Sequence, residues 1–272
     1  MSGVLGSLLG SPRGYSAQSQ QFLSRIVDPG VIRCNLYAAM IDGFVNDGNW
    51  ASITGLWMHA ADVIATAKIN LKSSSYTCIQ TGTLTFTANH GFTGNGSTGY
   101  LDTGIDNKGG ISQNNNSFGY YCLTARTAYV TMIAMGADDG TGPRDYGPRY
   151  TTNYSQIVDE GGLSYYTGGS SDGTSDTSGM HIVSVTGATT GAIYRNGNTT
   201  AAHALAGTTV AVTTAHNIYL FARSADPGPG ADTFTTDQHA AHFVGTGLTA
   251  TQASKIAARI NTYLTALSVN AY

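Results

Sequence analysis

The chain has 272 residues with a formal net charge of −3, and 11% of its residues are charged, against about 25% in an average domain. Glycine, with 35 residues, is roughly twice as frequent as the usual ~7%, and 41% of residues are hydrophobic, which excludes a highly charged disordered chain. The lack of a basic cluster excludes nucleic acid as an expected partner. No apolar run approaches the ~18 residues that a membrane-spanning helix needs, so we expect no membrane insertion.

Cysteine usage and the first residues bear on where the protein is made. Cys34, Cys78 and Cys122 lie far apart, which favours buried thiols in a reducing compartment over disulfides or a paired-cysteine metal site. The segment Met1–Gly10 lacks the basic region that begins a signal peptide. We therefore expect synthesis in the cytoplasm without a signal peptide, and neither a metal site nor another cofactor.

Residues 1–30 differ in composition from the rest of the chain. They are rich in Gly, Ser and Gln and end at Pro29-Gly30, a flexible junction. One apolar patch interrupts the segment: Phe22, Leu23, Ile26 and Val27. We predict that residues 1–30 form an assembly arm that orders on other subunits, followed by a single domain over 31–272. The alternative is a disordered terminus.

A helical periodicity follows the arm. The apolar residues Tyr37, Met40, Ile41, Phe44 and Val45 fall at i, i+3, i+4, i+7 and i+8, which places them on one face of a helix. The residues after Gly48, from Trp50 to Ala60, prolong a helical spacing. We therefore predict a helical segment over 36–67.

Short strands separated by glycine turns occupy most of the remaining chain. The clearest is the hairpin Met180–Asn198, whose alternating β-branched residues lead to a tight Asn196-Gly197 turn. The other predicted strands are Thr83–Thr87, Ser117–Arg126, Ala128–Ala134, Thr151–Val158, Leu163–Tyr166, Thr208–Thr213, Ile218–Arg223 and Gln238–Val244. The sheet-packing residues are predicted to include Ile182, Val183, Ile193, Leu220 and Phe221.

The last element is a predicted helix over 249–267. Thr249 and Gln252 form a capping box, and Ile256, Ile260 and Leu264 lie in one apolar stripe. Many short strands with few helices predict a mainly β protein, a two-sheet antiparallel jelly-roll sandwich. We expect the helical N-terminal part beside it, and the C-terminal helix packed on the outside of a sheet.

Three motifs then suggest a family. A Leu-aromatic-x-x-Ala-Ala piece from Leu56 runs into Asn70-Leu71-Lys72, a Gly-Phe-x-Gly-Asn-Gly-Ser turn from Gly91 precedes Tyr-Leu-Asp-Thr-Gly at 100–104, and Gly-Leu-Thr at 247–249 opens the last helix. In this combination the chain resembles the concanavalin A-like, laminin-G-like jelly-roll module of structural proteins in tailed bacteriophages and prophages. The resemblance covers residues 35–270. It implies two face-to-face antiparallel sheets and a virion protein, and it carries no catalytic residues.

The residues that could carry chemistry give little support to an enzyme. The chain lacks a nucleophile elbow, a phosphate loop and an HExxH motif. Glu160 is the only glutamate, whereas a glycoside hydrolase needs two carboxylates, so we predict no catalytic residues. His239 and His242 are three residues apart in an extended segment and are expected on opposite faces.

Aspartates gather in the loops at Asp138-Asp139, at Asp172 with Asp176, and at Asp226 with Asp232. This spacing favours ordinary Asx turns, and a calcium site is the alternative.

Tyrosine and arginine alternate in one region of the predicted strands and loops. Tyrosine rings stack on sugars and arginine donates to hydroxyls, so this set is the candidate glycan site: Arg144, Tyr146, Arg149, Tyr150, Tyr154, Tyr165 and Tyr166. The alternative is that these side chains belong to the core or to a subunit interface, where tyrosine is also favoured.

Our first functional hypothesis is a non-enzymatic bacteriophage virion structural protein, a head decoration, fibre or tail component with a lectin-like jelly roll at the particle surface. It would assemble with other virion proteins and with copies of itself. The alternative is a carbohydrate-binding module for host-surface glycans, and the third hypothesis is a glycan-cleaving enzyme.

Overall fold

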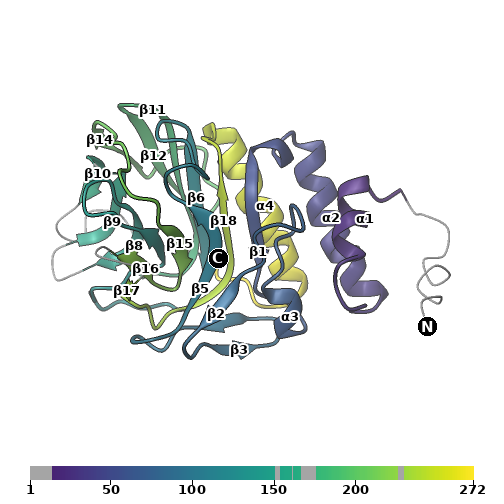
Figure 1. Ribbon diagram of the computed structural model, residues 1–272. Coiled ribbons are helices and arrows are strands. Elements are labelled where there is room, and N and C mark those ends of the chain that lie inside the picture. Colours follow the sequence, from purple (N-terminus) through teal and green to yellow (C-terminus); the bar gives the residue numbers. More distant parts are fainter. Residues whose placement is uncertain (1–13, 151–153, 161, 167–175, 226–229) are drawn as a thin grey trace.

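The computed structural model describes residues 14–150, 154–160, 162–166, 176–225 and 230–272. Two antiparallel β-sheets pack face to face, and helices cover the outer side of one of them (Figure 1). The predicted mainly β jelly-roll sandwich is confirmed. None of the described helices is long and apolar enough to cross a membrane.

Sheet A has eight strands and lies next to the helices. Its strand order is β13-β12-β11-β6-β18-β4-β3, and β1 pairs with β18 beside β4. The strands are β1 (Ile53–Met58), β3 (Thr85–Thr87), β4 (Gly91–Thr93), β6 (Asn116–Cys122), β11 (Gly179–Gly187), β12 (Thr190–Arg195), β13 (His203–Ala204) and β18 (Gln238–Gly245). The central strands β6 and β18 are buried on both faces.

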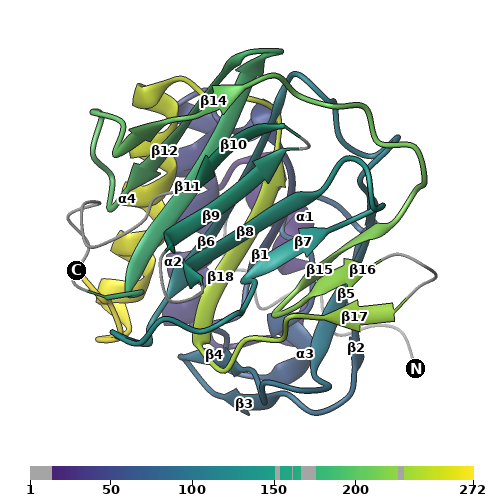
Figure 2. The same cartoon turned by 90° about the vertical axis from the view of Figure 1, so that its left-hand side faces the viewer.

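Sheet B has ten strands. Its order is β14-β10-β9-β8-β7-β15-β5-β2, and β16 joins it through β7 and carries β17. The strands are β2 (Ile79–Thr81), β5 (Tyr100–Asp106), β7 (Met135–Ala137), β8 (Arg144–Tyr150), β9 (Tyr154–Glu160), β10 (Leu163–Tyr166), β14 (Ala206–Gly207), β15 (Asn217–Leu220), β16 (Arg223–Ala225) and β17 (Gly230–Asp232). Figure 2 views the outer face of this sheet, with the helices on the far side of the molecule.

The helices are α1 (Ala17–Leu23), α2 (Val31–Asn46), the 3-10 turn η1 (Trp50–Ser52), α3 (Ile64–Ala67) and α4 (Ala250–Ala266). The predicted C-terminal helix is confirmed, with Thr249 and Gln252 making the expected capping box. Helix α4 lies between sheet A and α2, so it is not the outermost layer (Figure 1).

The predicted helix over 36–67 is wrong in its middle part. Helix α2 ends at Asn46, and Ile53–Met58 is strand β1, which pairs with β18. Five of its six residues are buried, so the apolar spacing reflects burial on both faces of a strand and not one face of a helix. The β-branched Ile53 and Thr54 also suit a strand, and Gly55 leaves the room that the Trp57 ring needs, since a Cβ there would lie 2.6 Å from that ring.

Apolar residues form two separate layers. The inter-sheet layer lies between sheets A and B, and the helix layer lies between sheet A and the helices. Strand β11 contributes to both, because Val183 faces the inter-sheet layer and its neighbour Ile182 faces the helix layer. The predicted core residues Ile193, Leu220 and Phe221 all lie in the inter-sheet layer.

The described part of the expected arm packs on α2. Phe22 is fully buried and its ring meets Tyr37 edge to face at 5.0 Å. Leu23 and Ile26 pack against the same layer, while Val27 is 68% exposed. The body of this chain therefore holds most of the apolar patch. A docking role for these residues stays a prediction, and residues 1–13 lie outside the described part of the chain.

Candidate functional site

Three buried histidines form a hydrogen-bonded row in the inter-sheet layer. Nε2 of His59 lies 3.0 Å from Nδ1 of His242, and Nε2 of His242 lies 3.1 Å from Nδ1 of His239. The row ends at the carbonyl of Ala67, 2.7 Å from Nδ1 of His59. All three side chains have no exposed surface. The row thus ties the end of β1 to strand β18 and helix α3.

The expectation that His239 and His242 point to opposite faces is wrong. The β18–β6 pairing shifts register between His239, which pairs with Cys122, and Ala241, which pairs with Tyr121. A bulge of this kind puts two residues opposite one and reverses the alternation of the side chains. Both histidines therefore face the inter-sheet layer. Two residues three apart in a strand point to the same face only where a bulge lies between them.

Burial keeps the histidine row neutral. It lowers the pKa of His59 to about 4, and that of His239, which is also close to His59 and Arg126, to about 3. Around the row, the Tyr120 ring stacks on His181 at 4.7 Å and meets Tyr146 edge to face at 5.1 Å. The row is shut away from solvent, so it is poorly placed to act on a large substrate.

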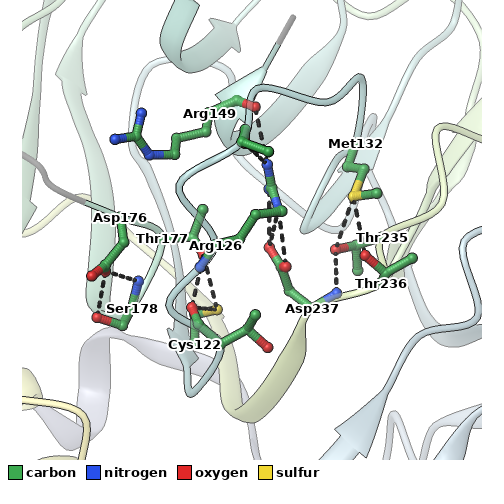
Figure 3. Close-up of polar contacts among 12 residues, drawn as sticks. Cys122, Arg126, Met132, Arg149, Asp176, Thr177, Ser178, Thr235, Thr236 and Asp237 are labelled. Atoms are coloured by element: carbon green, nitrogen blue, oxygen red, sulfur yellow. Dashed lines mark hydrogen bonds and ion pairs between the residues drawn. The ribbon is translucent and has the colours of Figure 1, made fainter. Parts of the chain in front are cut away.

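A second polar cluster lies beside the row at the start of β18 (Figure 3). Asp237 is fully buried, and both of its carboxylate oxygens accept from the guanidinium of Arg126 at 3.0–3.3 Å. The Cys122 thiol donates to the carbonyl of Thr124 at 3.4 Å and contacts the Thr177 hydroxyl at 3.9 Å. Burial and the nearby carboxylate of Asp237 raise the pKa of the Cys122 thiol.

The ligand atoms of Cys122, Asp237 and His239 lie within 4.8 Å of one another, and no other such group of three occurs in the described part of the chain. The sequence analysis missed this group because Cys122 is distant in the chain from Asp237 and His239. Asp237 and His239 are two apart and share one face of an extended segment. His239 is also the direct cross-strand partner of Cys122. The Asp-x-His spacing can be seen in the sequence, but the pairing of β18 with β6, which brings Cys122 to the other two residues, cannot.

The outer face of sheet B carries the other polar site. A register row crosses it from Ile79 in β2 to Asp102 in β5, Tyr219 in β15, Gly136 in β7 and Asp145 in β8. Helices cover sheet A and leave this face of sheet B open (Figure 2). Within the row, Ile79 is 69% exposed and Asp102 is partly exposed, whereas Tyr219 and Asp145 are buried, so the accessible part of the row lies on β2 and β5.

Two tyrosines and an amide–carboxylate pair gather around Asp102 and Tyr219 of this row. The rings of Tyr100 and Tyr219 stack with centroids 4.2 Å apart, and Phe234 lies 6.5 Å from Tyr100. The Asn217 amide donates to both carboxylate oxygens of Asp102 at 3.0 and 3.1 Å. Burial, Tyr100 and Asp102 together raise the pKa of Tyr219. We name Tyr100, Tyr219, Phe234, Asp102 and Asn217 the tyrosine platform.

The aspartates considered for calcium have other partners where they are described. Arg223 makes ion pairs with Asp138 at 3.0 Å, Asp145 at 2.9 Å and Asp232 at 2.8 Å, so a guanidinium occupies the centre of this acidic group. Asp139 accepts from four backbone N–H groups, which outweigh its burial and lower its pKa. Asp176 caps Ser178. Asp172 and Asp226 lie outside the described residues.

The residues predicted to bind glycan divide into two groups. Arg144, Tyr146 and Arg149 are buried, with 2%, 2% and 7% of their surface exposed, and Tyr146 belongs to the inter-sheet layer. Buried side chains cannot stack on or donate to a sugar, which matches the core alternative for these three. The others lie on strands β8, β9 and β10, but their side chains are outside the described structure: Tyr150, Tyr154, Tyr165 and Tyr166.

The comparisons with known proteins rest on structure alone. No family model matches the sequence, and no curated protein matches it. Domain 4 of AbnA, a GH43 extracellular arabinanase from Geobacillus stearothermophilus solved in complex with arabinotriose, is 14% identical, with a TM-score of 0.53. The match covers 76% of this chain and 98% of that chain. A Trypanosoma rangeli sialidase mutant displaying trans-sialidase activity is 12% identical, with a TM-score of 0.48, over 85% of this chain and 39% of that chain. The first likeness shows a shared β-sandwich fold.

Proposed function

We propose that this chain is a non-enzymatic carbohydrate-binding β-sandwich module and that the tyrosine platform on sheet B holds the sugar. The platform is the single observation on which the proposal rests. Support comes from the similar domain of the arabinanase, which was solved with arabinotriose and which this chain matches over almost its whole length. The proposed function is therefore the alternative hypothesis of the sequence analysis, with the sugar-binding site placed on different residues.

The platform has the chemistry that sugars require. A pyranose or furanose ring has an apolar face that packs on an aromatic ring, and hydroxyls at its edge that need polar partners. Tyr100 offers a partly exposed ring for stacking, whereas Tyr219 is only 5% exposed and serves to hold the Tyr100 ring in place, not to contact the sugar. Asp102 is held in place by Asn217, so it can accept from a sugar hydroxyl without losing side-chain freedom on binding.

Several observations support a binding function over hydrolysis. A glycosidase needs one carboxyl group with a raised pKa as general acid and a second one nearby. On sheet B, Arg223 outweighs the effect of burial and lowers the pKa of Asp232, which is the opposite of that requirement. Glu160 is on β9 next to Leu163 of β10, with its side chain outside the described structure. Turnover of a polysaccharide that disappears in Glu160→Gln would contradict the non-enzymatic proposal.

The binding test uses arabinotriose and a panel of bacterial surface oligosaccharides in isothermal titration calorimetry. Tyr100→Ala should weaken binding at least tenfold, which is about 1.4 kcal/mol, because the stacking ring is gone. Tyr100→Phe should bind within about twofold of the parent, since it keeps the ring. Tyr272→Ala is the matched control, because Tyr272 is 37% exposed and stacks on Tyr121 on the helix side of the molecule.

Two results would contradict the glycan proposal. One is equal binding by Tyr100→Ala and the parent protein. The other is no measurable binding to any sugar of the panel, provided that the protein unfolds cooperatively and is therefore folded in the assay.

A virion is the setting that we propose for this module. The resemblance of its three motifs to those of tailed-phage structural proteins supports it. Because Phe22 is buried against α2 and Ser16 bonds to Asp42 of α2, the segment from Ser16 onward belongs to the body of the domain and is not a detachable arm. Deleting residues 2–13 should leave the unfolding midpoint unchanged but abolish incorporation into particles, measured by electron microscopy of labelled protein. Normal incorporation of the deletion variant would show that the sandwich itself makes the contacts.

A further inference from the structure

The cluster of Cys122, Asp237 and His239 has the composition of a metal site. Its donors are one sulfur, one carboxylate oxygen and one imidazole nitrogen, and all three side chains are fully or almost fully buried. Aliphatic and aromatic side chains of the inter-sheet layer surround them. Such a set, with a thiol and an imidazole, is suited to Zn²⁺ or Co²⁺ and not to Ca²⁺ or Mg²⁺, which prefer oxygen ligands.

A second observation points to a missing ligand. Nδ1 of His239 is bonded to His242, but Nε2 of His239 is completely buried and has no partner among the described residues. A buried imidazole nitrogen without a hydrogen bond is costly, by about 1–3 kcal/mol. A metal ion on this nitrogen would remove that cost. The bond from Nδ1 to His242 would then orient the ring, as the outer partners of metal-bound histidines do.

We propose that Cys122, Asp237 and His239 bind a Zn²⁺ ion between the two sheets, at a site that joins β6 to β18. The inference is independent of the sugar-binding proposal. Tetrahedral zinc places its ligand atoms about 3.5 Å apart, so the three side chains would draw together by roughly 1 Å. The three protein ligands leave a fourth position for a water molecule.

Arg126 is compatible with this site. It binds the carboxylate of Asp237 through Nε and one terminal nitrogen; Oδ2 accepts from both of them, whereas Oδ1 accepts from Nε alone and has a further lone pair for a metal. A thiolate and a carboxylate give the ligand set two negative charges, so the site together with Zn²⁺ and the Arg126 guanidinium carries a net charge of +1. On binding, the Cys122 thiol loses its proton to solvent and a sulfur–zinc bond forms.

The test uses Co²⁺ as a spectroscopic substitute for zinc. The full chain is unfolded in urea with a reductant and refolded with one equivalent of CoCl₂, because the site is closed in the folded protein. The expected result is a thiolate-to-cobalt charge-transfer band in the near ultraviolet and visible bands of tetrahedral cobalt. A chromophoric chelator then gives the Zn²⁺ affinity by competition.

Matched variants separate a real site from unspecific binding. Cys122→Ser should remove the charge-transfer band, and His239→Gln should weaken zinc binding by about a hundredfold. Cys78→Ser changes the other buried cysteine, which is not part of the cluster, and should keep both signals. Circular dichroism confirms that each variant is folded.

Two outcomes would overturn the proposal. One is the absence of a charge-transfer band in the refolded parent protein. The other is a band that Cys78→Ser removes as fully as Cys122→Ser does. Either result would leave Arg126 and Asp237 as a buried ion pair without a metal.

Discussion

The two interior layers of the molecule differ in the kind of side chain that they bury. The helix layer is built mainly from aliphatic and aromatic side chains, such as Ile256, Ile260 and Leu264 against sheet A and α2. The inter-sheet layer includes the histidine row and borders the ion pair of Arg126 and Asp237. Apolar packing tolerates small shifts, whereas buried polar groups require specific partners. The inter-sheet layer should therefore be the more sensitive to single changes.

The largest expected effect comes from Asp237→Ala. It leaves the guanidinium of Arg126, 11% exposed, without its carboxylate partner. Loss of one partner of a buried pair costs about 3–5 kcal/mol in the free energy of unfolding, measured by urea denaturation. Asp47→Ala is the control, because its partners Arg259 and Lys255 are 41% and 46% exposed, and should cost about 0–1 kcal/mol. Equal costs for the two variants would contradict the comparison.

In the helix layer, Ile260→Ala should lower the free energy of unfolding by about 2–5 kcal/mol, because it leaves a cavity under α4. Ile260 is completely buried. Ile64→Ala makes the same change at a residue that is 42% exposed and should cost less than about 1 kcal/mol. An unchanged unfolding midpoint for Ile260→Ala would mean that α4 is not docked on sheet A and α2.

A smaller, pH-dependent effect comes from the histidine row. His59 has a folded-state pKa of about 4 against 6.5 in the unfolded chain, so below pH 6.5 the unfolded state binds more protons. The free energy of unfolding should therefore fall as the pH is lowered from 6.5 to 4, by about 1.4 kcal/mol per pH unit for this group. His59→Gln should flatten the profile, whereas His90→Gln, at a partly exposed position, should not. An equal slope in both variants would contradict the assignment.

The same contrast explains what could be predicted from the sequence. The α4 stripe and its capping box were visible because a helix repeats its contacts at a fixed spacing. The strands of the hairpin at β11 and β12 were visible for a similar reason. Strand β1 was misassigned because it is buried on both faces, so its residues show no alternation between apolar and polar.

The candidate sites could not be predicted in this way, because strand pairing makes them. Tyr100 and Tyr219 are distant in sequence and meet only through the pairing of β5 with β15. His239 reaches Cys122 through the β18–β6 register, and a bulge turns it toward the same layer as His242. Tyr146 was a candidate for the glycan site with the core as its alternative, and its place on β8 puts it in the core.

Strand β18 has a consequence for how the chain acquires its structure. It lies in the middle of sheet A, between β6 on one side and β1 and β4 on the other, yet it follows all three of them in the sequence. Until then, β1 and β6 present unpaired edges, which invite association between nascent chains. Pairings of such long sequence separation also make folding slow. Sheet A can therefore close only after β18 has been synthesised, and the yield should depend on chaperones that hold the incomplete chain.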